Sequence, residues 1–170
     1  GYKPHLACLT PEERELGKVL MVRHNIQVQS SIKNAYRFER DGLRYAIFQG
    51  EKVVVSDAAE QLRKEGIDLI AGFKFVCENN RPKMVFSIRT SENINAAKFA
   101  QAFNGNGHSR AAGFPLDLLE DDPNPYLLFR ALIYIYSIAG GEAENIGQAF
   151  LDRIAKHPHA GSQSYPQQFR

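Results

Sequence analysis

The chain has 170 residues, 44% of them hydrophobic and 24% charged, which is the composition of an ordinary globular domain that buries one sizeable core. Its 21 lysines and arginines nearly balance 19 aspartates and glutamates, so the net charge of +2 excludes a strongly basic surface overall and leaves only a local patch for any nucleic-acid contact. The longest strongly apolar stretch, residues 131–139, is far shorter than the roughly 20 residues that span a bilayer, so we expect no membrane insertion.

The first predicted element is a long helix that begins at Thr10. Thr10 supplies a capping hydroxyl, Pro11 suits the first helical position, and Glu13 lies three residues after the cap. The apolar residues that follow are unevenly spaced. We expect this helix to end at Asp41-Gly42 and to connect the domain to another part of a longer polypeptide, since the chain opens with Gly1 and no leader sequence.

The middle of the chain alternates strand and helix patterns, which predicts an α/β fold with a small mixed β-sheet flanked by helices. Within the strand at 83–89, Met84, Phe86 and Ile88 should face one side, and Ser87 and Arg89 the other. The expected elements are strands at 43–49 and 52–55 around a turn at 50–51, a helix at 57–65 capped by Ser56 and closed by Gly66, strands at 67–76 and 83–89 joined by a turn at 78–82, and a helix at 95–103.

The last third of the chain is predicted to be helical. An acidic, proline-broken linker at 118–125 precedes helices at 126–139 and 142–156, and the tail after His157 has no apolar period and should be loose. Aromatic residues recur in the first of these helices. This pattern favours packing on the core or on a second copy over a platform for base stacking.

The two cysteines, Cys8 and Cys77, lie far apart, each within or beside apolar residues. They favour reduced structural thiols over a disulfide, and we therefore expect a cytoplasmic protein.

A glycine-rich turn follows the helix at 95–103. Gly105-Asn106-Gly107-His108, followed by Ala111-Ala112-Gly113-Phe114, resembles the glycine-glycine-glycine-histidine signature of the DHH-associated domain in RecJ-type exonucleases and nanoRNases, with Asn106 in place of the second glycine. Upstream, Ser87-Ile88-Arg89-Thr90-Ser91 resembles that family's strand ending in serine-leucine-arginine-serine, and 95–100 resembles the helix that leads into the glycines. The resemblance covers residues 43–116, with its elements in the family's order.

This resemblance implies the substrate-binding half of a DHH-superfamily phosphoesterase, a nuclease or phosphodiesterase. Residues 1–41 would then be a connecting helix from a catalytic domain, 42–117 the DHH-associated domain, and 118–170 a helical extension. The implied partners are a short oligonucleotide, a dinucleotide or a cyclic dinucleotide, together with a catalytic domain in cis that holds Mn²⁺ or Mg²⁺. No cofactor is expected in this chain, and a homodimer is a further candidate assembly.

The residues of this segment independently favour a phosphate site. Glycines let the backbone approach a ligand and expose amide donors, and an arginine fork matches phosphate oxygens. A histidine can donate to an oxygen or lie against a base. The predicted substrate-binding residues are Ser87, Arg89, Gly105, Asn106, Gly107, His108 and Arg110.

Structural explanations for the same residues stay open. Gly105 and Gly107 fit an ordinary helix cap and turn, and His108 an ordinary turn position. Arg89 would serve as the partner of a surface ion pair, and Arg110 as a solvated charge. Another local basic cluster, Arg37, Arg40 and Arg44, fits either a strand-backbone contact or a solvated helix end.

No metal site and no catalytic residue is predicted in this chain. The family's catalytic half binds metal through aspartates and an aspartate-histidine-histidine triplet, and this sequence contains no Asp-His pair. The acidic pairs at 12–13 and 121–122 are explained as solvated charge, with an ion held by Asp121, Asp122, His157 and His159 as the alternative. Two other functions remain open: a free-standing nucleotide-binding protein, and a module for tRNA binding and dimerisation like that of alanyl-tRNA synthetases.

Overall fold

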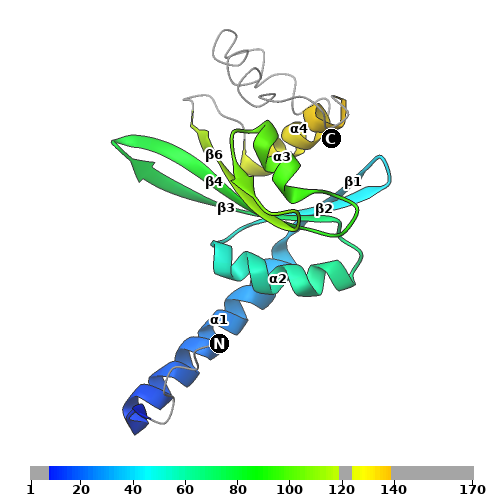
Figure 1. Cartoon of the computed structure of the whole chain (residues 1–170). Coiled ribbons are helices and arrows are strands. Elements are labelled where there is room, and N and C mark those ends of the chain that lie inside the picture. Colours follow the sequence, from blue (N-terminus) through cyan, green and yellow to red (C-terminus); the bar gives the residue numbers. More distant parts are fainter. Residues whose placement is uncertain (1–7, 119–123, 139–170) are drawn as a thin grey trace.

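A computed structural model describes residues 8–118 and 124–138, which form a mixed six-stranded sheet with helices on both faces (Figure 1). The strand order is β1-β2-β3-β4-β6-β5, and every neighbouring pair is antiparallel except β2 and β3. The predicted α/β class is confirmed. The elements are α1 (Pro11–Asn34), β1 (Tyr36–Arg40), β2 (Leu43–Gln49), α2 (Lys52–Lys64), β3 (Leu69–Glu78), β4 (Arg81–Thr90), α3 (Ala96–Ala102), β5 (Asn106–Gly107), β6 (Ala111–Asp117) and α4 (Pro125–Ile138).

Helix α1 begins as its sequence predicts. The Thr10 hydroxyl accepts from the backbone N–H of Glu13 at 3.1 Å, and the Glu13 carboxylate accepts from the backbone N–H of Thr10 at 2.7 Å. This capping box satisfies amides that would otherwise have no partner in the first turn. The helix then projects away from the sheet, so its N-terminal half has little of the body beside it (Figure 1).

The predicted end of that helix was wrong. α1 stops at Asn34, and residues 36–40 form strand β1, which pairs with β2 in a hairpin. Asp41 and Gly42 are the hairpin turn, with φ of 52° and 77°, because a two-residue turn between twisted strands needs left-handed backbone at both positions. The alternation of half-buried Tyr36, Phe38 and Arg40 with exposed neighbours is the strand signal.

The predicted strand at 52–55 was also wrong. Residues 52–64 form the single helix α2, so Ser56 lies inside the helix and Glu51 stands at its N-cap. The valines favour a strand locally, but their burial with later residues at helical spacing decides the outcome, since tertiary packing overrides propensity. The buried positions on this face are Val54, Val55, Ala58, Ala59 and Leu62. Gly66 closes the helix with φ of 88°, as expected.

The two faces of the sheet have different partners. One face packs on α2 and the C-terminal part of α1, with Val28, Ala46 and Ile70 in that cluster. The other face packs on α3 and α4 and holds the larger aromatic core. In β4 the side chains alternate as predicted: Met84, Phe86 and Ile88 are buried in the aromatic core, while Val85, Ser87 and Arg89 are half-buried on the α2 face.

Helix α4 is a core element, as the aromatic pattern predicts. Phe129 and Leu132 are fully buried, and the Phe129 ring stacks on Phe86 with 5.8 Å between centroids. The predicted helix at 142–156 and the tail lie outside the described residues. None of the described helices is long and apolar enough to cross a membrane.

Candidate phosphate-binding face

The candidate site is built on strand β4 where it emerges beside α2. Ser87 pairs with Gly72 of β3 on one side and with Gly113 of β6 on the other. Two residues further along, Arg89 pairs with Ile70 and with Ala111. Paired residues in neighbouring strands project to the same face of a sheet. Ser87 and Arg89 therefore stand on the α2 face, next to two of the smallest side chains of β6.

The glycine-rich turn lies on the other side of β6 from β4. Asn106 of β5 pairs with Gly113, and the backbone N–H of His108 donates to the carbonyl of Ala111 at 2.7 Å. Asn106 and His108 are thus placed across β6 from Ser87 and Arg89. All four residues came from the sequence prediction.

These four residues surround a patch made of Gly113 and Ala111. Neighbouring strands are spaced by about 4.8 Å, so the backbones of Arg89 and His108, which lie two strands apart, are separated by about 10 Å. Side chains that lean inward across such a span can share one tetrahedral anion. We call Ser87, Arg89, Asn106 and His108 the corner residues of this face.

The Arg89 side chain is held by its own chain. Its Nη2 donates to the Ser56 hydroxyl of α2 at 2.8 Å, and its Nη1 donates to the Ile88 carbonyl at 2.8 Å. Both acceptors are uncharged. The pKa of Arg89 is lowered from its usual value by burial and by the nearby charge of Arg63. No carboxylate neutralises this partly buried cation among the described ion pairs, and the ion-pair explanation for Arg89 is wrong within them.

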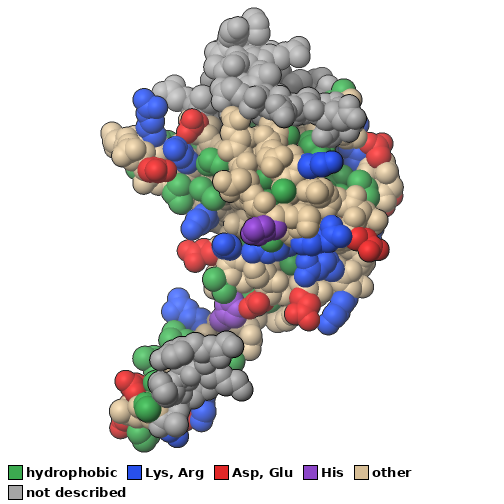
Figure 2. Space-filling view, in the orientation of Figure 1, with side chains coloured by type: hydrophobic (Ala, Val, Ile, Leu, Met, Phe, Trp, Pro, Cys, Tyr) green, Lys and Arg blue, Asp and Glu red, His purple; other side chains and the backbone are tan. Residues whose placement is uncertain are grey.

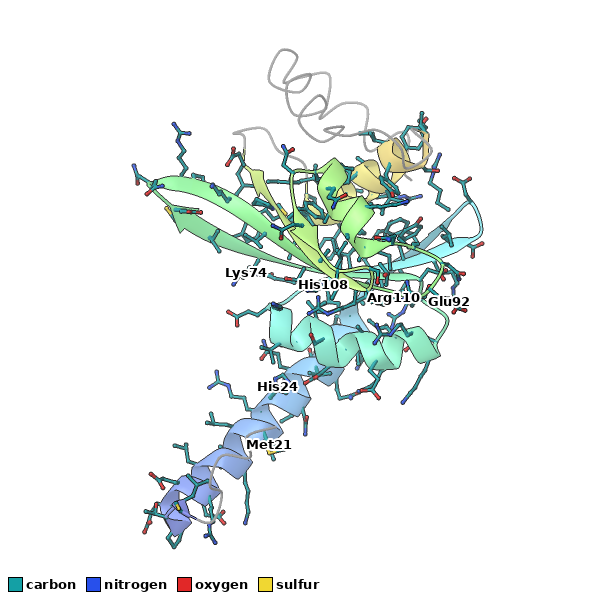
Figure 3. All side chains as sticks on the ribbon, in the orientation of Figure 1. Met21, His24, Lys74, Glu92, His108 and Arg110 are labelled. Carbon is teal, nitrogen blue, oxygen red and sulfur yellow. The ribbon has the colours of Figure 1, made fainter. Side chains whose placement is uncertain are left out.

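Further basic side chains lie around the same strand end. The backbone N–H of Thr90 donates to the carbonyl of Arg110 at 3.0 Å, and Nη1 of Arg63 lies 3.5 Å from the carbonyl of Thr90. Figure 3 shows His108, Arg110 and Lys74 on the side of the sheet that faces α2. In Figure 2 this region is a band of lysine and arginine side chains with a histidine among them. Arg63 and Lys74 were missed by the sequence prediction, because only the fold brings Arg63 to the end of β4 and Lys74 to the same face of the sheet.

The two glycines of the turn are required by the chain's own packing. A Cβ at Gly105 would lie 2.2 Å from the carbonyl oxygen of Gly113, and one at Gly107 would lie 2.4 Å from the Cα of Ala112. Gly107 also has φ of 152°. The close approach of β5 to β6 therefore accounts for both glycines as parts of a turn, without a ligand. The glycines shape the turn that presents Asn106 and His108.

A network around Asp68, which no motif in the sequence indicates, holds the loop after β4. The Asp68 carboxylate accepts from the Arg44 backbone N–H at 3.0 Å, the Ser91 hydroxyl at 2.9 Å and the Asn93 amide at 2.8 Å. Burial alone raises the pKa of Asp68, but the hydrogen bonds from Asn93, the Arg44 backbone and Ser91, with the Arg44 charge, outweigh it and lower the pKa below 3.8.

The loop is also tied to the glycine turn. The carbonyl of Ser109 accepts from the Thr90 hydroxyl at 3.2 Å and from the backbone N–H of Ala96 at 2.9 Å. Thr90 is fully buried. The end of β4, the start of α3 and the turn that carries His108 are therefore one connected unit.

The other candidate clusters have structural roles. Arg37 pairs with Glu65 at 3.2 Å, Arg44 donates to the Glu65 carbonyl, and the Arg40 guanidinium lies 4.2 Å from the centre of the Tyr134 ring. The described part of the chain contains no group of three histidine, cysteine or acidic side chains that could hold a metal ion. The alternative ion site at 121–122 and 157–159 lies outside the described residues. Cys8 and Cys77 are free thiols, as expected. Both are exposed, however, so they are not buried structural residues of the core.

No protein-family model and no curated protein matches this sequence. Among solved structures, the chain is similar to PggH, a pGpG-specific phosphodiesterase from Vibrio cholerae, with 15% sequence identity and a TM-score of 0.48. The match covers 74% of this chain and 42% of that one, so the chain spans less than half of the phosphodiesterase.

Proposed function

We propose that this chain binds a phosphate group of a short oligonucleotide or dinucleotide on the α2 face of its sheet, between Arg89 and His108. The observation that carries the proposal is the strand register. Arg89 pairs with Ala111 in β4 and β6, and the backbone N–H of His108 donates to the carbonyl of the same Ala111 from the other side. Both residues therefore flank the small side chain of Ala111.

The chemistry of the face suits an anion. Arg89 is a partly buried cation whose hydrogen-bond partners are uncharged, and Arg63 and Arg110 add positive charge nearby. A phosphate placed there would supply the missing negative charge and accept the remaining guanidinium N–H donors, in the geometry that arginine favours. Ser87 and Asn106 would add neutral donors, which position a phosphodiester without further charge.

We also propose that the chain positions a substrate and does not cleave it. Phosphodiester hydrolysis in the family it resembles needs Mn²⁺ or Mg²⁺, and a metal site needs several oxygen or nitrogen ligands at fixed distances. No described cluster supplies such ligands. In this account a catalytic domain of the same polypeptide holds the metal, and the face described here orients the substrate's phosphate and terminal nucleotide.

The test uses the purified chain with a 5′-phosphorylated dinucleotide such as pGpG, followed by calorimetric titration. We expect saturable binding that inorganic phosphate weakens and that falls as salt rises, since charge dominates the contact. With Mn²⁺ added, the same chain should not turn over the dinucleotide or bis(p-nitrophenyl) phosphate above background. Chelator-sensitive turnover would overturn the positioning role, and absence of any binding at millimolar ligand would overturn the phosphate site.

A further inference from the structure

A second surface, on α1, is apolar and uncovered. Its large hydrophobic side chains are exposed: Leu16 59%, Val19 62%, Leu20 54%, Met21 67%, Val22 58% and Ile26 65%. A single exposed leucine is ordinary, but a contiguous set on one helix marks an interaction site. This surface is remote from the corner residues and its role does not depend on the proposed function.

Leu16, Val19 and Ile26 lie on the side of α1 that α2 does not use. α2 is contacted by His24, whose Nε2 lies 2.6 Å from the Asp57 carboxylate, and the inner face of α1 continues through the buried Val28 and Ile32. Successive residues in a helix are about 100° apart, so Ile26 points well away from Val28. The outward positions follow a regular spacing of four and three residues: Glu12, Leu16, Val19, Arg23, Ile26, Ser30 and Lys33.

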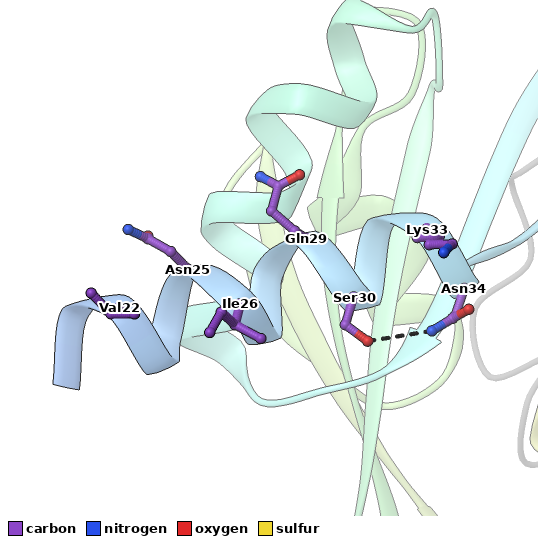
Figure 4. A pocket seen from close by; sticks show the side chains of 7 residues that line it. All are labelled: Val22, Asn25, Ile26, Gln29, Ser30, Lys33 and Asn34. Carbon is purple, nitrogen blue, oxygen red and sulfur yellow. Dashed lines mark hydrogen bonds between the residues drawn. The ribbon is translucent and has the colours of Figure 1, made fainter. Parts of the chain in front are cut away.

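Positions with this spacing form the seam along which two coiled-coil helices pair, and Leu16, Val19 and Ile26 are its apolar members. Next to it, α1 lines an open hollow of about 620 Å³ along its C-terminal half (Figure 4). Val22 and Ile26 supply its apolar lining, and Ser30 and Lys33 its polar end. A side chain from a partner helix would fill this hollow as a knob fills a hole.

The charges at the two ends of the seam favour a second copy of α1 as the partner helix, in the antiparallel direction. Its N-terminal end carries Glu12, and its C-terminal end carries Lys33. Neither makes an ion pair with any described residue. An antiparallel copy of α1 would place Glu12 of each chain near Lys33 of the other, whereas a parallel copy would place like charges together.

We propose that two copies of this chain associate through their α1 helices, antiparallel, along this seam. The register that best matches the apolar residues places Leu16 opposite Ile26 of the second copy. It also lays the aliphatic stem of Arg23 on the second copy's Val19. Two-fold symmetry repeats each contact, so the seam buries Leu16, Val19 and Ile26 of both copies.

The decisive test measures the mass of the full chain in solution by sedimentation equilibrium up to about 100 μM. We expect a dimer. Replacing Leu16 and Ile26 together with glutamate should weaken association at least tenfold, whereas Val53→Glu, at an equally exposed site of α2, should leave it unchanged. A monomeric wild-type chain, as expected if a different domain covers α1, would overturn the proposal, as would a dimer that tolerates the double substitution.

Charge exchange and crosslinking test the direction. Glu12→Lys or Lys33→Glu alone should weaken the dimer about threefold to tenfold, and the double exchange should restore it, because the pair is reversed and not removed. In a chain with Cys8 and Cys77 replaced by serine, Leu16→Cys with Ile26→Cys should form a covalent dimer on oxidation, and Leu16→Cys alone should not. Efficient crosslinking of the single variant would show a parallel pair and contradict the proposed arrangement.

Discussion

The Arg89 guanidinium donates to the Ser56 hydroxyl at 2.8 Å, joining the end of β4 to helix α2. This contact holds a cation in place beside the glycine turn before any ligand arrives. A side chain that is already ordered loses less entropy on binding. Ser56 is therefore a positioning residue for the proposed phosphate site.

We predict that Ser56→Ala weakens dinucleotide binding about twofold to fivefold while the fold remains intact. The lost hydrogen bond contributes about 1 kcal/mol, and the freed guanidinium can still reach a phosphate. Calorimetric titration measures the affinity and thermal unfolding measures the fold. Ser56→Thr, which keeps the hydroxyl, is the matched control and should bind as the wild type does.

Asp68 should make stability depend on pH in the acid range. Its pKa is lowered in the folded state, so its contribution is present above the unfolded pKa of about 3.8 and is lost as pH falls through the lower folded value. Urea unfolding of wild type and Asp68→Asn at several pH values tests this. We expect the variant to lose about 1–3 kcal/mol at pH 7, with the difference shrinking below about pH 3.8. A difference that does not change with pH would contradict the role of the charge.

The glycine turn should tolerate no larger residue at Gly105. A Cβ there meets backbone and Phe114 within 2.8 Å, so Gly105→Ala must separate β5 from β6. We expect a loss of about 2–4 kcal/mol in the free energy of unfolding. Gly17→Ala in α1 is the control: nothing lies within 4 Å, and the change should stabilise the helix by about 0.5–1 kcal/mol. Equal effects of the two substitutions would refute this explanation of Gly105.

Helix α4 should be required for a stable sheet. Phe129 is fully buried and contacts the rings of Phe38, Phe86 and Phe99. Phe129→Ala should cost about 3–5 kcal/mol, measured by denaturant unfolding. The exposed Ile138, at the end of the same helix, gives the comparison, and Ile138→Ala should cost less than about 0.5 kcal/mol. A mild effect of Phe129→Ala would make α4 an independent appendage.

Most of the fold could be predicted from short stretches of sequence, because in those stretches the local preference and the tertiary packing favour the same structure. The capping box at Thr10, the alternation in β4 and the aromatic period of α4 are all short-range signals that the packing reinforces. The failures came where two signals compete. Residues 52–55 have strand propensity but helical burial, and Asp41-Gly42 suits both a helix end and a hairpin turn.

The candidate site was predicted in part for the same reason. Arg89 and His108 stand in a motif that can be read along the chain, and the register then brings them together across Ala111. Ser56, Arg63 and Lys74 carry no such motif. They join the face only because α2 and β3 lie beside β4, which no short stretch of sequence specifies.

The most direct test of the proposed function is the affinity of Arg89→Ala and His108→Ala for a 5′-phosphorylated dinucleotide, measured by calorimetric titration of the folded chain. Each charged hydrogen bond to phosphate contributes about 1.5–3 kcal/mol, so each variant should bind roughly tenfold more weakly or worse, with an unchanged melting temperature for His108→Ala. Lys98→Ala, an exposed basic residue of α3 outside the face, should bind as the wild type does. If both site variants keep wild-type affinity, the glycine turn has only a structural role and the phosphate site is not on this face.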